Sequence, residues 1–107
     1  MDFQFNTGNK VDGDARMDAH FEARFRERLD RFEPRLSRIE VHVRDTDGTR
    51  RDGPDGIEAV IEARPYNGEP LTTSDRAATP EAAVSAALQK LVARLDATFG
   101  KADRVRK

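Results

Sequence analysis

The apolar residues of this chain change their spacing twice, and this pattern limits the folds that are open to it. Across residues 14–32 they recur every three or four positions, which is the spacing of one face of an α-helix. Across residues 39–73 they largely alternate with polar residues, as in strands with one buried face. The helical spacing returns across residues 79–99. Because each helical segment has a single apolar stripe, both helices should cover the same face of one sheet.

Local signals bound the individual elements. Phe3 and Phe5 alternate with polar neighbours and predict a first strand. Pro34 disfavours helical backbone in the residue before it and should end the first helix. Asn67-Gly68 predicts a two-residue hairpin, and Gly100 is the expected end of the last helix. The residues that we expect to be buried are Met17, Phe21, Phe25, Ile39, Val41, Ile61, Val84, Leu88, Leu91 and Leu95.

The element order that follows is β-α-β-β-β-α, an α+β two-layer sandwich. A helical crossover joins the first two strands, so these should be parallel, in a four-stranded sheet of order 1-2-3-4. Residues 1–107 should form a single domain. Residues 45–56 contain three Gly, one Pro, two Arg and four Asp, which predicts a mobile hairpin tip. Residues 101–107 should form a C-terminal tail.

Composition excludes several classes of protein. The chain has no cysteine, so it has neither a disulfide framework nor a thiolate metal site. No apolar run approaches the roughly 20 residues that span a bilayer. The first residues lack the basic and apolar regions of a signal peptide, so we expect a cytoplasmic protein with no membrane partner.

The charged residues are sorted along the chain, although the net charge is only −1. Residues 16–38 carry seven Arg against five acidic residues, and residues 79–107 carry six Lys and Arg against three. Residues 40–75 carry nine acidic residues against four Arg. The two helices should therefore be basic and the sheet acidic, which gives the domain an oriented field. The open face of the sheet, expected to be solvated and acidic, should carry Glu40, His42, Glu58, Val60 and Glu62.

Basic side chains form a narrow sector on each helix, about a quarter-turn from the apolar stripe. These residues are Arg24, Arg28 and Arg31 on the first helix, and Lys90, Arg94 and Lys101 on the last. The acidic residues Asp18, Glu22 and Asp96 fall on the opposite flank, which suits contact with phosphate. An ordinary solvated helix face is the alternative interpretation. Since the helices should run parallel, we expect two rows about 10 Å apart rather than one walled cleft.

Catalytic and metal-binding patterns are weak. His20 and His42 stand on different elements, and Ser74 and Ser85 lack an evident base. Residues 45–48 resemble the start of a calcium loop, but the glycine comes too early and later ligands are missing. We therefore expect no enzyme activity, no cofactor, no metal and no small-molecule substrate.

Several strings, in this order and spacing, resemble the ribosome hibernation promoting factor and ribosome-associated inhibitor family. They are Thr7-Gly8-Asn9 with Val11, Ala23-Arg24-Phe25 with Phe32, and Ala82-Ala83-Val84 with Lys90-Leu91. The resemblance implies a stress or dormancy protein that binds 16S rRNA of the 30S subunit. It also implies that the helical face blocks tRNA and mRNA positions and catalyses nothing. Arg24 and Lys90 match basic positions of the family, and the chain resembles its short, single-domain form. The oligomeric state stays open.

Some positions depart from the pattern of the family. Ala93 and Ala97 stand where relatives often have basic residues, and Glu27 replaces a common lysine. Fewer phosphate contacts imply weaker and less salt-sensitive binding to the ribosome. The alternative function is a protein-interaction module of the same fold that has lost ribosome binding and uses its acidic sheet face.

Overall fold

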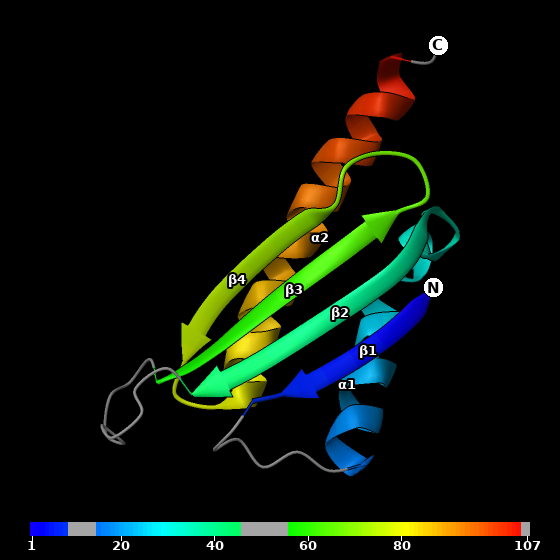
Figure 1. The fold of residues 1–107 in the computed structure, drawn as a ribbon. Helices are drawn as coiled ribbons and strands as arrows, with labels where there is room; N and C mark the ends of the chain where they lie inside the picture. Colours follow the sequence, from blue (N-terminus) through cyan, green and yellow to red (C-terminus); the bar gives the residue numbers. More distant parts are fainter. Residues whose placement is uncertain (9–14, 46–55, 106–107) are drawn as a thin grey trace.

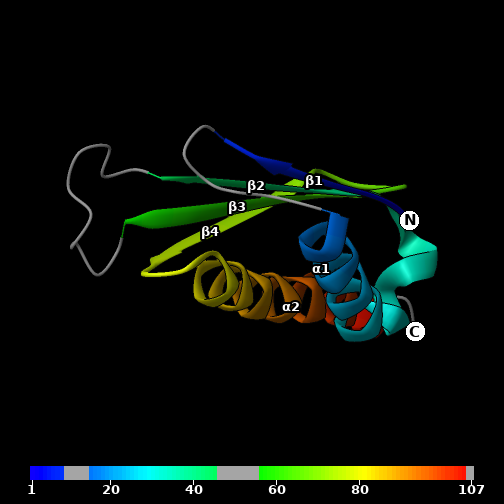
Figure 2. The same cartoon turned by 90° about the horizontal axis from the view of Figure 1, so that it is seen from below.

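A computed structural model describes the backbone of residues 1–8, 15–45 and 56–105, and the side chains of these residues except 15 and 101–105. Two layers are visible in Figures 1 and 2, with the sheet on one side and both helices on the other. The elements are β1 (Asp2–Thr7), α1 (Ala15–Arg28), the 3₁₀-helix η1 (Asp30–Arg35), β2 (Leu36–Asp45), β3 (Ile57–Pro65), β4 (Leu71–Ala77) and α2 (Pro80–Val105). The predicted hairpin tip falls largely on residues 46–55, which lie outside the described residues.

The sheet has four strands in the order β1-β2-β3-β4. β1 and β2 are parallel, with Phe3 opposite Ile39, and the other two pairs of neighbours are antiparallel. The order, the parallel pair and the placement of both helices on one face confirm the prediction, since the single apolar stripe of each helix leaves no other arrangement.

The core lies between the two layers. Phe21 and Phe25 of α1 are buried together with Leu29, which precedes η1, and Phe32 of η1. α2 contributes its own stripe, and its buried members are Ala83, Val84, Ala87, Leu88, Leu91 and Leu95. The strands supply alternate residues, which are Ile39, Val41, Val43, Ala59, Ile61, Ala63 and Leu71. Of the residues predicted to be buried, Met17 differs because it is only partly buried at the edge of the core.

The first helix ends earlier than predicted. α1 stops at Arg28, and η1 carries the chain through Pro34 into β2. The amide of Phe32 donates to the carbonyl of Leu29 at 2.9 Å, which is the shorter-range bonding of a tight turn. Pro34 opposes continuation of the α-helix, because its ring would clash with the carbonyl four residues earlier. Phe32 remains buried despite the change of helix type.

Two boundary predictions are wrong. The β3–β4 connection covers residues 66–70 rather than two residues, because Pro65 precedes it, Pro70 is its last residue, and neither proline can donate to a ladder. Gly68 lies within it at φ +124°, so glycine is required there. α2 begins as predicted, with the amide of Ala82 donating to Thr79 Oγ1 at 3.2 Å. It continues past Gly100, because this glycine does not adopt the positive φ that closes a helix.

Candidate nucleic-acid interface

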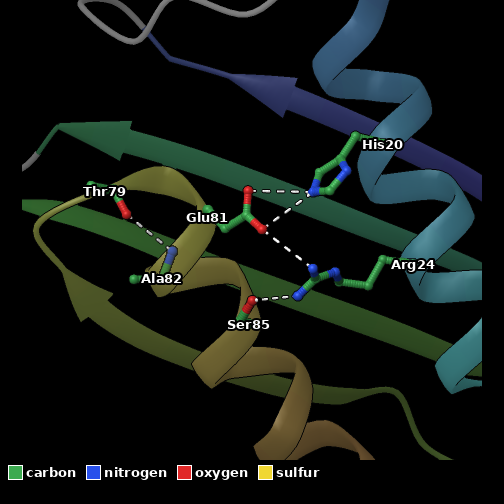
Figure 3. Close-up of polar contacts among 6 residues, drawn as sticks. All are labelled: His20, Arg24, Thr79, Glu81, Ala82 and Ser85. Carbon is green, nitrogen blue, oxygen red and sulfur yellow. Dashed lines mark hydrogen bonds and ion pairs between the residues drawn. The ribbon is translucent and has the colours of Figure 1, made fainter.

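The basic row of α1 faces α2. Arg24 Nη1 donates to Ser85 Oγ at 3.0 Å, and Arg24 Nη2 lies 3.3 Å from Glu81 Oε1 (Figure 3). Further along, Arg31 Nη1 lies 2.6 Å from Asp96 Oδ1. Two of the three predicted cations on this side therefore form ion pairs with carboxylates of the other helix.

His20 completes the cluster around Glu81. Its Nε2 lies 3.3 Å from each oxygen of the Glu81 carboxylate, so one carboxylate serves both His20 and Arg24 (Figure 3). His20 and Arg24 are four residues apart on α1, as are Glu81 and Ser85 on α2, so each pair lies on one side of its helix. We call these four residues the inter-helix cluster.

Arg28 is the free cation of the α1 row. Its side chain is exposed and, in the part of the chain that the structure describes, it has neither a hydrogen bond nor an ion pair. It lines a shallow depression together with His20, Ala23, Arg24 and Glu27. The guanidinium of Arg28 can therefore take an anionic ligand without first losing an internal partner.

The basic row of α2 lies on the flank of this helix that faces away from α1, over β4. Lys90 Nζ donates to the carbonyl of Ser74 at 3.1 Å, and Arg94 Nη1 donates to the carbonyl of Thr72 at 2.9 Å. These contacts also occupy carbonyl groups of a strand at the edge of the sheet, which would otherwise be open to another strand. The two rows therefore lie on different flanks of α2, and their spacing of about 10 Å stays a prediction. Lys101 belongs to α2, but its side chain lies outside the described residues.

Lys90 also lies 3.3 Å from Asp75 Oδ2. A hydrogen bond from the backbone amide of Arg76 lowers the pKa of Asp75 below its ordinary value of 3.8, and Lys90 lowers it further. Lys90 is still more than half exposed, so part of the ammonium group remains available to solvent and to anions.

The prediction that acidic side chains keep clear of the basic rows is wrong. Asp96 lies on the flank of α2 away from Lys90 and Arg94, as predicted, but that flank faces α1 and Arg31. Helical wheels treat each helix alone and do not show which flank meets a neighbour. The signal that could have predicted the inter-helix cluster is the four-residue spacing of polar residues on each helix, His20 with Arg24 and Glu81 with Ser85.

The prediction of an acidic sheet face is also wrong. Arg44 Nη2 lies 2.8 Å from Glu58 Oε1, and Arg64 Nε lies 3.0 Å from Glu62 Oε1. The register places equal numbers of the two signs on this face among the described residues, namely Asp2, Glu40, Glu58 and Glu62 against Arg38, Arg44, Arg64 and Arg76. Three of the acidic residues counted in the middle segment belong to 46–55, outside the described part. The described face is therefore electrically balanced.

The described residues offer little for other chemistry. Among them, no group of three or more His, Cys, Asp or Glu side chains could hold a metal ion. None of the helices in the described ranges is both long and apolar enough to cross a membrane.

A β-α-β-β-β-α sandwich with exposed cations along its helical layer is a class of small α+β domain suited to an anionic partner. Residues 6–102 match the family described as sigma 54 modulation protein / S30EA ribosomal protein, and the chain belongs to this family. The resemblance seen in the sequence is thereby confirmed, and the family is one of ribosome-associated modulation and hibernation proteins. No curated protein matches the chain.

Proposed function

We propose that the protein binds the 30S ribosomal subunit through its helical face and inactivates it by occlusion. In this proposal the helical layer lies against the backbone of 16S rRNA and excludes tRNA and mRNA, and no bond is made or broken. The protein would act in the cytoplasm, where ribosomes are. The observation that carries the proposal is the family match over residues 6–102.

Cations of the helical layer would supply the contacts to rRNA. They are Arg24, Arg28 and Arg31 on the α1 side, and Lys90, Arg94 and Lys101 on the α2 side. Guanidinium groups bind phosphate oxygens in pairs, and such contacts position a protein on RNA without reading its sequence. One row lies towards the groove between the helices and the other over β4, and this placement suits two separate stretches of backbone.

The charge balance of the domain predicts moderate affinity. About five neutralised phosphates give a plot of log affinity against log salt with a slope of about −3.5 to −4.5. The balanced sheet face gives no support to a docking surface for a basic protein partner, so the interaction-module alternative has no observation in its favour.

Reversal of charge at Arg28 tests the proposal most directly, because this residue has no internal partner to lose. Arg28→Glu should weaken co-sedimentation with purified 30S particles by about tenfold or more, given the strength of hydrogen bonds to charged groups. Arg64→Glu makes the same charge change on the sheet face and should leave binding unchanged.

Three results would contradict the proposal. The wild-type protein could fail to bind 30S particles even at low salt, Arg28→Glu could bind as well as wild type, or Arg64→Glu could lose as much binding as Arg28→Glu.

A further inference from the structure

We infer that Glu81 and Asp96 compete with RNA phosphate for Arg24 and Arg31 and thereby limit the affinity of the helical face. The inference rests on the proposed function, because it concerns the same surface. Each carboxylate occupies a guanidinium group that the proposed interface needs. RNA must displace both carboxylates before Arg24 and Arg31 can bind its backbone.

Both contacts join different elements of the fold. Glu81 and Asp96 belong to α2, whereas Arg24 belongs to α1 and Arg31 to η1. The Arg24–Glu81 distance is 3.3 Å and the Arg31–Asp96 distance is 2.6 Å. The carboxylates therefore lie on the helical layer itself, within the surface where phosphate would bind.

The pairs are weak enough for RNA to replace them. The side chains of Arg24 and Glu81 are 38% and 55% exposed, and those of Arg31 and Asp96 are 62% and 47% exposed. Exposed ion pairs change an equilibrium constant by roughly 1.4- to 5-fold. A phosphate that accepts two hydrogen bonds from one guanidinium is the stronger ligand. RNA should therefore bind, but its affinity is reduced by the free energy of each ion pair that it breaks.

The surrounding residues ease this exchange at Arg24. His20 Nε2 lies 3.3 Å from the same Glu81 carboxylate, so Glu81 keeps a polar neighbour when Arg24 turns away. Ser85 lies on the other side of the guanidinium, where its Oγ accepts from Nη1. Figure 3 shows that the guanidinium of Arg24 lies between Glu81 and Ser85. Arg24 is thus held in place by groups that do not enclose it.

The test compares the affinities of four variants for 30S particles with that of the wild-type protein. Glu81→Gln and Asp96→Asn should each tighten binding by about two- to fivefold, and the double variant by about four- to twenty-fivefold, since the two pairs share no residue. Glu62→Gln removes the same charge from the sheet face and should bind like wild type. The inference is wrong if the α2 variants bind no more tightly than wild type. It is also wrong if Glu62→Gln gains as much, because net charge alone would then explain the effect.

A double-mutant cycle shows whether Glu81 acts through Arg24. In an Arg24→Gln background at low salt, the additional change Glu81→Gln should no longer tighten binding, because the arginine that it releases is gone. A gain of the same size in both backgrounds would overturn the inference.

A measurement without ribosomes separates this inference from the proposed function. Inorganic pyrophosphate is titrated into ¹⁵N-labelled protein, and the Nε–Hε signal of Arg24 is followed by NMR. Half-saturation should occur at about a two- to fivefold lower concentration in Glu81→Gln than in wild type. Equal half-saturation overturns the inference. If the wild-type protein does not bind 30S particles but this shift is found, the proposed function fails and the competition stands.

Discussion

Truncation of Phe25 to alanine should strongly destabilise the domain, because this side chain holds α1 against the sheet. Phe25 is 0% exposed, and its ring centroid lies 5.2 Å from that of Phe3 on β1. The truncation removes the apolar transfer free energy and leaves a cavity, which together cost about 3–5 kcal/mol. The whole free energy of unfolding of a small domain is about 5–15 kcal/mol, so the truncation would remove from about a fifth to nearly all of it.

Urea denaturation followed by far-ultraviolet circular dichroism measures the loss. In a thermal melt the same loss should lower Tm by about 12 °C or more, at about 4–8 °C per kcal/mol. Tyr66→Ala is the matched control, because Tyr66 is 66% exposed and should change stability by less than about 0.5 kcal/mol. A loss below about 1 kcal/mol for Phe25→Ala would refute this account of the core.

Three further predictions concern the sheet and its edge. The backbone amide of Arg76 and, to a smaller extent, Lys90 lower the pKa of Asp75 in the folded protein. The ionised carboxylate of Asp75 therefore stabilises the fold at pH above the ordinary pKa of 3.8, and this stabilisation is lost as pH falls through the lower folded-state pKa. Asp75→Asn should therefore be less stable than wild type at neutral pH, and the difference in stability should disappear in acid. If melts over a range of pH show the same acid sensitivity for both proteins, Asp75 does not have this role. Gly68→Ala should lower the free energy of unfolding by about 1–2 kcal/mol in denaturant melts, because φ at this position is +124°. Nothing lies within 4 Å of the added methyl group, so the loss would come from backbone strain alone, and an unchanged midpoint would contradict it. The Thr73 hydroxyl donates to the main-chain carbonyl of Ala87 in α2 at 2.9 Å. Thr73→Val should therefore lower the free energy of unfolding by about 0.5–1.5 kcal/mol in the same assay, and increased stability would count against that hydrogen bond.

The topology could be predicted from the sequence because burial leaves a periodic trace. Phe21, Phe25 and Leu29 are spaced by four, and Ile39, Val41 and Val43 by two, and these residues are buried. One apolar stripe on each helix requires one covered sheet face, and the crossover helix requires a parallel first pair. None of these steps depends on the details of side-chain contacts.

The boundaries were harder to predict because the same residue has different effects in different backbone conformations. Gly100 ends a helix only when it adopts a positive φ, and here it continues α2. Gly68 does adopt a positive φ, but Pro65 and Pro70 lengthen the connection beyond two residues. Pro34 lies within a 3₁₀-helix, a conformation that the apolar spacing does not distinguish from an α-helix.

The positions of the basic residues could be predicted, but their partners could not, and the reason is geometric. On α2 the basic row turns towards β4, so the opposite flank, which carries Asp96, turns towards α1. η1, which continues the chain after α1, presents Arg31 to that flank. The separation of basic and acidic side chains on α2 thus leaves Asp96 facing Arg31, and the two form an ion pair. A count of cations includes arginines that already have carboxylate partners, whereas Arg28 has none among the described residues. Arg28 is therefore the position at which we expect an RNA backbone to bind first.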